Sequence, residues 1–364
     1  MFRECLLGEV LTLKRGYDLP SQNRNDGSIP IVSSSGITGT HSDAKVKGPG
    51  VVTGRYGTIG EVHFIDTDFW PLNTTLYVQD FKGNDPRFVA YFLRTLNFAS
   101  RSAAAAVPGV NRNDLHRIPV RCPTPSLQRR IAAILSAYDD LIENNTRRIA
   151  ILEEMARRLY EEWFVRFRFP GHEHTPMVDS PLGPVPEEWR ASRLGNEIEL
   201  AYGKALKAEV REAGDVPVYG SSGVVGLHSV SLVDGPGIIV GRKGNVGSVH
   251  WCDVPFFPID TAYYVKSALP LHFVFFNLQQ QNFLNNDAAV PGLNRNQAYA
   301  LPLLVPSPDL LARFENTCAN MLGLARVLSR KNTNLRSTRD LLLPKLISGE
   351  LDVSDLPEPR AASA

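Results

Sequence analysis

The sequence repeats itself about 187 residues downstream, and this duplication limits the possible folds more than any other feature. Residues 7–78 align with 194–265 without a gap, and about 30 of the 72 positions are identical. A four-residue deletion then changes the offset to 183, so that "VPGVNRN" at 107–113 matches "VPGLNRN" at 290–296. Solenoid repeats are roughly 20–50 residues long. The much longer period here predicts a duplicated domain pair.

Each repeat begins with a part that is rich in glycine, proline and short apolar runs, at 1–125 and 189–307. Runs such as "GEVHFI" and "TTLYV" lie between turn residues, a pattern typical of short strands. In 85–100 apolar side chains recur on one helical face, which predicts an amphipathic helix. They are Phe88, Phe92, Leu96 and Ala99. We therefore predict the α+β class, with two similar domains of mixed β-sheet and helices.

Each repeat ends in a long helical pattern. Thr124-Pro125 and Ser307-Pro308 are start signals, because a hydroxyl can cap a helix and proline is tolerated in its first turn. Apolar residues then recur three and four positions apart, which predicts a coiled-coil seam. The seam residues are Ile131, Leu135, Tyr138, Ile142, Leu152 and Leu159 in the first helix, and Phe314, Met321, Leu328, Leu335 and Leu342 in the second. We expect Asn145 and Asn332, within the same stripes, to fix the register. We expect Gly349 to end the second helix.

Composition and missing motifs narrow the function. The net charge is +1, and the four cysteines contain no C-x-x-C pair, which favours a reducing cytoplasm. No apolar run is long enough to span a membrane. The P-loop, H-E-x-x-H and G-x-S-x-G motifs are missing, so we expect a non-catalytic binding protein with no cofactor. The proline-rich segment that holds His172-Glu173-His174 offers no fourth ligand nearby, so we expect no metal site.

Several ordered segments carry a family resemblance that covers nearly the whole chain. "GPGVVTGRYGTIGEVHF", "VPGVNRNDLHRIPVRCPTPSLQRRIAAIL" and "LLLPKLISGELDV" resemble the specificity (S) subunit of type I restriction-modification systems. The predicted plan is target recognition domain 1 at 1–125, a central conserved helix at 126–169, a linker at 170–188, target recognition domain 2 at 189–307, a distal conserved helix at 308–350 and a tail at 351–364.

The resemblance also implies a function and partners. Each recognition domain would read one half of a bipartite double-stranded DNA target. The two long helices would pack antiparallel and set the spacer between the halves. Two modification (methyltransferase) subunits would dock on the helices and bring S-adenosylmethionine for adenine-N6 methylation. Restriction (endonuclease/translocase) subunits would bring ATP and Mg²⁺. The alternative is a two-lobed scaffold that binds carbohydrate or protein. It would lack a basic face that both lobes share.

The candidate DNA contacts lie in short motifs that occur in both repeats. In "GRYG" and "GRKG", the glycines would let the backbone approach DNA while Arg55 and Arg242 contact phosphate or a guanine edge. The alternative is a tight turn with a solvated arginine. Tyr56 and Lys243 differ between the repeats, so we expect the shared arginine to position the DNA and its changed neighbour to discriminate.

Three further groups complete the candidate set. Serines can donate to phosphate or form a turn, and "NRN" asparagines and arginines can pair with adenine and guanine or cap a helix. The remaining residues are variable positions near the first strand. The groups are Ser34, Ser35, Ser221 and Ser222; Asn111, Arg112, Asn294 and Arg295; and Lys14, Arg15 and Lys204. We expect His41 and His228 to form hydrogen bonds within their own domains.

Overall fold

The computed structural model describes residues 2–98, 109–283 and 292–357. The chain divides into two compact units. Unit 1 is Met1–Thr146 with Arg330–Ala364, and unit 2 is Arg147–Ser329. Each unit contains the globular domain of one repeat and a section of both long helices. The unit boundaries therefore fall inside the helices.

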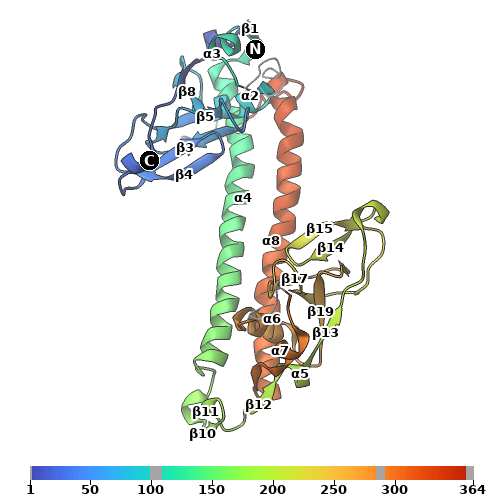
Figure 1. The fold of residues 1–364 in the computed structure, drawn as a ribbon. Coiled ribbons are helices and arrows are strands. Elements are labelled where there is room, and N and C mark those ends of the chain that lie inside the picture. Colours follow the sequence, from blue (N-terminus) through green and yellow to red (C-terminus); the bar gives the residue numbers. More distant parts are fainter. Residues whose placement is uncertain (1, 99–108, 284–291, 358–364) are drawn as a thin grey trace. The chain divides into compact units, whose positions relative to one another are not determined.

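Unit 1 is built from two sheets, a strand pair and short helices (Figure 1). The first sheet is antiparallel, in the order β2 (Thr12–Arg15), β8 (Thr75–Asp80), β5 (Gly50–Gly54) and β6 (Val62–Ile65). The second has the order β4 (Gly36–His41), β3 (Ile29–Ser33) and β7 (Trp70–Pro71), and β1 (Phe2–Leu6) pairs with β9 (Pro119–Pro123). The helices are α1 (Leu7–Val10), α2 (Pro86–Arg94) and α3 (Arg112–His116), of which α2 packs on β5 and β6.

Unit 2 repeats this topology strand for strand. Its first sheet has the order β13 (Ile198–Tyr202), β19 (Ala262–Ser267), β16 (Gly237–Gly241) and β17 (Val249–Cys252). Its second sheet has the order β15 (Gly223–His228), β14 (Val216–Gly220) and β18 (Phe257–Pro258). The remaining elements are the pair β12 (Arg190–Arg193) with β20 (Pro302–Val305), and α5 (Leu194–Glu197), α6 (Leu271–Gln280) and α7 (Arg295–Ala300). The matched order confirms the predicted α+β class and the internal repeat.

Two buried histidines at equivalent positions, His41 and His228, confirm that the repeats also agree in detail. His41 Nδ1 accepts from the backbone N–H of Asn25 at 3.1 Å, and His228 Nδ1 accepts from that of Glu212 at 3.1 Å. Each bond therefore ties the end of a strand to the loop that precedes the second sheet, as predicted for histidines that serve their own domain.

The long helices are α4 (Pro125–Tyr160) and α8 (Pro308–Ser348), and both begin at the predicted proline. In unit 1, Asn145 Nδ2 donates to Asn332 Oδ1 at 2.9 Å, and Asp139 pairs with Arg339 further along. Residue numbers thus rise on one helix as they fall on the other, which confirms the antiparallel arrangement. Gly349, with φ +80°, follows the last residue of α8 as predicted.

The predicted seam residues differ in burial. Five are buried, namely Ile131, Leu135, Ile142, Phe314 and Leu328. The other six are half-buried, namely Tyr138, Leu152, Leu159, Met321, Leu335 and Leu342. Two helices alone cannot enclose a whole stripe. Three of the five buried positions, Ile131, Leu135 and Phe314, lie in hydrophobic clusters that also include residues of the globular domains.

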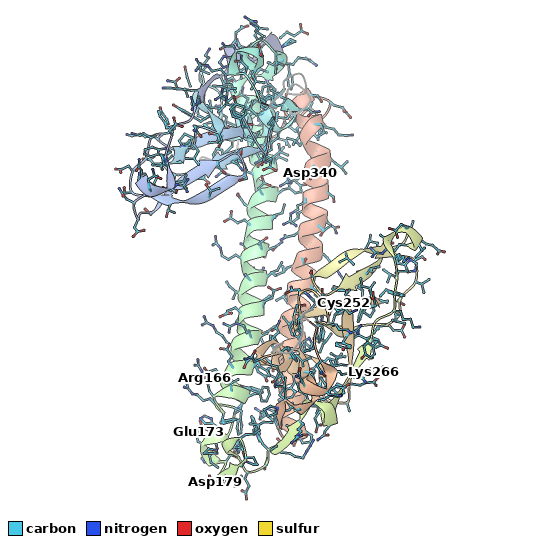
Figure 2. All side chains as sticks on the ribbon, in the orientation of Figure 1. Arg166, Glu173, Asp179, Cys252, Lys266 and Asp340 are labelled. Carbon is cyan, nitrogen blue, oxygen red and sulfur yellow. The ribbon has the colours of Figure 1, made fainter. Side chains whose placement is uncertain are left out.

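The first long helix ends earlier than the predicted 126–169. After Tyr160 the chain makes a π-helical turn, Glu161–Val165, and Arg166 follows it (Figure 2). The reason is an aromatic cluster, because Phe164 and Phe169 lie 5.8 and 5.5 Å from the ring of Trp189 and draw the chain back. The segment predicted as a linker also contains structure, a 3-10 turn at His172–His174 and the hairpin β10 (Met177–Ser180) with β11 (Gly183–Pro186).

The helix predicted at 85–100 is also shorter. Asp85 caps α2 by accepting from the N–H of Phe88 at 2.8 Å. The helix ends at Arg94, and Asn97 has a positive φ of 41°, which an α-helix does not accommodate. Ala99 and Ser100 lie outside the described residues.

Two negative findings hold for residues 2–98, 109–283 and 292–357. In these ranges, no helix combines the length and the apolar character that a bilayer span requires. In the same ranges, no three histidine, cysteine, aspartate or glutamate side chains gather in a way that could hold a metal ion.

Candidate nucleic-acid interface

Two motifs that are far apart in the sequence meet in each unit. They are the Gly-Arg loop (54–57 in unit 1, 241–244 in unit 2) and the Asn-Arg-Asn segment (111–113 and 294–296). In unit 1 the N–H of Val110 donates to the carbonyl of Arg55 at 3.1 Å, and in unit 2 the N–H of Leu293 donates to that of Arg242 at 2.7 Å. The same hydrogen bond therefore joins the motifs twice. Residues 107–108 and 290–291 of the longer motif lie outside the described residues.

The glycines of the Gly-Arg loop are required by its backbone. Gly57 and Gly244 have φ values of 76° and 80°, a region that favours glycine. A Cβ on Gly54 would lie 1.9 Å from the Thr58 carbonyl oxygen, and one on Gly241 would lie 2.1 Å from that of Asn245. The tight-turn interpretation is therefore correct for the backbone. It leaves the arginine side chains available for contacts.

The serine turns pack beside the Gly-Arg loops. An added Cβ on Gly57 would lie 3.2 Å from Ser34 Oγ, and one on Gly244 would lie 3.3 Å from Ser221 Oγ. Ser221 is only 8% exposed, so its selection as a DNA contact is not supported by the structure: its side chain packs against the loop. The exposed members of the turns are Ser35 and Ser222, while Ser34 is half-buried.

The asparagines of the Asn-Arg-Asn segments act as helix caps. Asn111 accepts from the N–H of Asn113 at 3.0 Å, and Asn294 accepts from the N–H of Asn296 at 2.9 Å. This is the capping alternative, and it occupies the oxygen that a bidentate contact with adenine would need. Arg112 and Arg295 are the first residues of α3 and α7, so the caps fix the backbone position of each arginine.

The arginines of the two units rest on different tyrosines. In unit 1 the guanidinium carbon of Arg55 lies 4.6 Å from the ring centre of Tyr56, its neighbour in the loop. In unit 2 Lys243 replaces that tyrosine, and Arg242 instead lies 4.9 Å from the ring of Tyr202 on β13. Arg295 lies 5.1 Å from the same ring. One tyrosine of unit 2 thus contacts the arginines of both motifs.

This stack forms part of a cationic cavity of about 370 Å³ in unit 2. Arg242, Lys243 and Arg295 line it, and none of its lining residues is acidic. Arg242 Nη1 also donates to the Asp260 carbonyl at 3.0 Å. Burial raises the pKa of Tyr263 on the cavity wall, which keeps its phenol neutral. The arrangement suits an anionic or electron-rich ligand.

The three variable positions in the candidate set, Lys14, Arg15 and Lys204, make different contacts. Lys14 lies 5.8 Å from the ring of Tyr17, and Arg15 pairs with Asp18 at 3.5 Å. Arg15 holds in unit 1 the position that Tyr202 holds in unit 2, whereas Lys14 points to the opposite face of β2 because strand side chains alternate. Lys204 is exposed, and its backbone N–H donates to the Pro258 carbonyl at 3.0 Å.

Sequence reasoning missed Tyr202. The alignment marks it as a variable position opposite Arg15, but it gives no sign that a strand residue supports an arginine forty positions away. The available signal was the loss of Tyr56 in the second repeat, which predicts that another aromatic ring takes over its role.

Comparisons with known proteins agree with this architecture. Residues 2–154 match the family described as "Type I restriction modification DNA specificity domain". The MjaIX specificity subunit of Methanocaldococcus jannaschii is 23% identical over 70% of this chain and 66% of its own length, just under two thirds. The HindI specificity subunit of Haemophilus influenzae is 21% identical over 69% of this chain and 73% of its own.

A solved structure gives the same result for the fold. The crystal structure of the type I restriction-modification S subunit from M. genitalium matches with a TM-score of 0.67 and 18% identity, over 95% of this chain and 96% of that one. This match agrees with the fold described above. Residues 2–154 thus match a type I restriction-modification DNA specificity domain, and the chain is similar to the specificity subunits of such systems.

Proposed function

We propose that this chain is the non-catalytic subunit that recognises a bipartite double-stranded DNA target, with unit 1 and unit 2 each reading one half. The observation that carries the proposal is the joining of the Gly-Arg loop and the Asn-Arg-Asn segment twice by the same hydrogen bond. In unit 2 this surface forms a cavity with three cationic lining residues and no acidic one. Arginine on such a surface can contact phosphate or bind both acceptors of a guanine edge.

The difference between the units supports two different half-sites. Arg55 and Arg242 share a backbone position but lie over tyrosines from different elements. Their guanidinium groups are therefore oriented by different neighbours, so the same residue can read different bases. The cationic cavity also favours nucleic acid over the carbohydrate- or protein-binding scaffold.

The partners belong to the same proposal. Modification subunits, one for each unit, dock on the helical pair and supply S-adenosylmethionine, while ATP and Mg²⁺ belong to the restriction subunits. Exposed leucines at equivalent positions of the two long helices support two similar docking places. They are Leu141 on α4, 53% exposed, and Leu324 on α8, 41% exposed.

Arginine substitutions in the assembled complex test the DNA interface. The target is first read from the methylome of cells that express the complex. Binding of duplexes with that target is then measured by fluorescence anisotropy at several salt concentrations. An Arg242→Ala change that removes a phosphate contact should weaken binding to all sequences and reduce the salt slope by about 1. Loss of a guanine contact should cost about 1–3 kcal/mol and relax one target position.

Arg55→Ala is the equivalent change in unit 1, and Arg193→Ala, on an exposed arginine of β12, is the matched control. We expect Arg55→Ala to affect the other half-site and Arg193→Ala to have no effect. Wild-type binding by both Arg55→Ala and Arg242→Ala at every salt concentration would contradict the proposed interface.

A further inference from the structure

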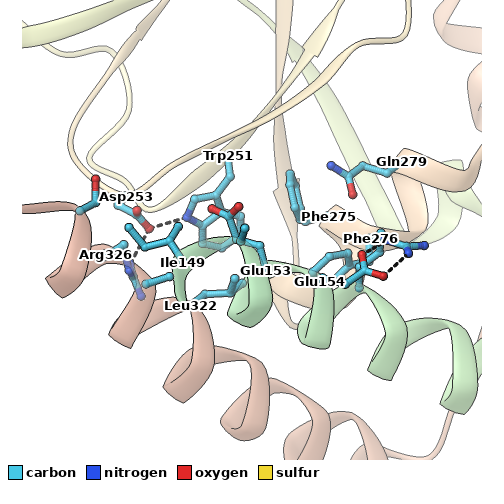
Figure 3. A pocket seen from close by; sticks show the side chains of 14 residues that line it. Ile149, Glu153, Glu154, Trp251, Asp253, Phe275, Phe276, Gln279, Leu322 and Arg326 are labelled. Atoms are coloured by element: carbon cyan, nitrogen blue, oxygen red, sulfur yellow. Dashed lines mark hydrogen bonds and ion pairs between the residues drawn. The ribbon is translucent and has the colours of Figure 1, made fainter. Parts of the chain in front are cut away.

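The two units contain pockets at equivalent places, between the recognition domain and the long helices, with different chemistry. The pocket of unit 2 measures about 570 Å³, and its lining includes Trp251, Phe275, Phe276 and Leu322 (Figure 3). The pocket of unit 1 measures about 200 Å³ and includes Asp139 in its lining. The equivalence follows from the sequence: 88–98 aligns with 273–283, and α4 aligns with α8 at an offset of 183.

Ion pairs fill the pocket of unit 1. Asp139 accepts from the hydroxyl of Tyr91 at 2.5 Å, lies 3.9 Å from Arg94, and pairs with Arg339, which reaches it from α8. Arg87, at the other end, lies 3.2 Å from Asp66. Each of these lining charges therefore has a partner, and little free volume remains.

Substitutions at the equivalent positions of unit 2 remove those ion pairs. Leu322 replaces Asp139, Phe276 replaces Tyr91, and Gln279 replaces Arg94. Ala156 replaces Arg339, so no arginine extends from that position of α4. The loss of that side chain and of its charged partner explains why the pocket of unit 2 is larger and has an apolar floor.

The rim of this pocket carries one unmatched charge among the described residues. Arg157 is held by Glu154 at 2.7 Å and also pairs with Glu161, and Arg326 pairs with Asp253. The exposed carboxylate of Glu153 also lines the pocket, and no described side chain pairs with it, although Arg157 lies four residues away and would be the expected partner. An apolar floor beside an unpaired carboxylate fits an apolar group that has a cation next to it.

We propose that the pocket of unit 2 receives one large aliphatic or aromatic side chain of a partner helix that carries a lysine or arginine one turn away, opposite Glu153. A helix suits the site because α4 and α8 form two of its walls, and helices bind such grooves through anchors three or four residues apart. The inference rests on the proposed assembly for the identity of the partner, the modification subunit. It adds that the two docking places differ, because the pocket of unit 1 is smaller and is lined by ion pairs.

Stepwise assembly tests the inference. The modification subunit is titrated onto the full chain, and native mass spectrometry gives a dissociation constant for each of the two binding steps. We expect the wild-type constants to differ by about tenfold or more. Glu153→Lys should weaken the tighter step by about tenfold and leave the weaker step unchanged. Arg336→Glu, at the equivalent exposed position of unit 1, is the matched charge reversal and should leave the tighter step unchanged.

A second variant tests the apolar floor. Leu322→Asp combined with Ala156→Arg introduces the ion pair of unit 1 into unit 2 and should make the two constants similar, while circular dichroism confirms that the chain is folded. Unchanged binding by both variants would overturn the inference, and so would equal weakening of both binding steps. Unchanged binding is also the result expected if a small apolar ligand, and not a partner side chain, occupies the pocket. A wild-type chain that binds no modification subunit would refute the proposed function itself.

Discussion

Tyr202 connects the two motifs of the proposed interface in unit 2. Arg242 and Arg295 come from different motifs, and both lie over its ring. A cation above an aromatic ring gains about 0.5–1 kcal/mol at an exposed site and more where water is excluded. The ring therefore orients two guanidinium groups before DNA binds, so that less side-chain freedom is lost on binding.

Replacement of this ring should weaken recognition in one half-site. Tyr202→Ala removes both stacking contacts, and we expect DNA affinity of the assembled complex to fall by about 5- to 30-fold, or about 1–2 kcal/mol. Tyr202→Phe keeps the ring and should stay near wild type. Fluorescence anisotropy with the methylome-derived target measures both changes. If Tyr202→Ala binds as tightly as Tyr202→Phe, the stack does not organise the interface.

Buried thiols predict a loss of stability at high pH. Burial raises the pKa of Cys318 to about 12 and that of Cys122 to about 11, from an ordinary value of 9.0. Between these values the unfolded chain loses the thiol protons while the folded chain keeps them. The unfolded state then binds fewer protons, and stability falls as the pH rises.

The expected result is a constant unfolding midpoint up to about pH 9 and a decline above it, with each thiol contributing at most about 1.4 kcal/mol per pH unit. Urea unfolding from pH 7 to 11 measures the decline. Cys318→Ala should make it less steep. An equally steep decline in a Cys318→Ala, Cys122→Ala double variant would assign the effect to other groups, such as the buried Tyr160, whose pKa burial also raises.

At the scale of elements, one polar pair interrupts the apolar seam. Asn332 Nδ2 also donates to the Ile142 carbonyl and to Thr146 Oγ1, both at 3.2 Å, so the Asn145–Asn332 contact belongs to a small buried network. At the equivalent positions of the other unit the residues are Ile149 and Leu328. The pair therefore occurs at one level of the seam, which makes the register of the two helices unique.

Single and double substitutions separate these roles. Asn332→Leu leaves the Asn145 amide buried without its partner and should cost about 1–3 kcal/mol in the free energy of unfolding. A double change of both asparagines to leucine should recover most of that loss. Urea unfolding of the chain in its assembled form measures both, with Asn334→Leu on the exposed side of α8 as the control. A single variant as stable as wild type would show that the network does not hold the helices.

The sequence predicts most elements correctly because the repeat tests each pattern twice. The prolines that begin α4 and α8, the glycine that ends α8, and the asparagine seam pair follow from local rules and are confirmed. The predicted end of α4 is wrong because packing on Trp189 determines where the helix ends. That contact joins residues about 25 positions apart in the sequence. The role of Tyr202 is likewise set by a tertiary contact.

At the scale of the whole molecule, the sequence suggests separate domains and helices, whereas the structure combines them into two units. The end of α8 contributes Leu346 and Ile347 to the core of unit 1, and its beginning contributes Phe314 and Cys318 to that of unit 2. A stripe of apolar residues three and four apart looks the same whether a helix or a sheet covers it. The spacing alone could not reveal this division.

The chain passes from one unit to the other inside the helices, at Thr146–Arg147 on α4 and Ser329–Arg330 on α8. If these sections set the target spacer, seven residues inserted into both helices there should lengthen each by about 10 Å and keep the seam in register. We expect a spacer about three base pairs longer with both half-sites unchanged, since B-DNA rises 3.4 Å per base pair. A seven-residue insertion in the β10–β11 turn is the control. An unchanged spacer in the double insertion would show that the helices do not determine the distance.

The central claim is that this chain chooses the DNA sequence that its partner subunits modify. Methylome sequencing of cells that express the modification subunit with and without this chain tests it most directly. We predict N6-methyladenine at one bipartite motif only when the chain is present, and relaxation of a single half-site when Arg295 is replaced by alanine. Identical methylomes with and without the chain, from cells in which both proteins are produced and folded, would contradict the account.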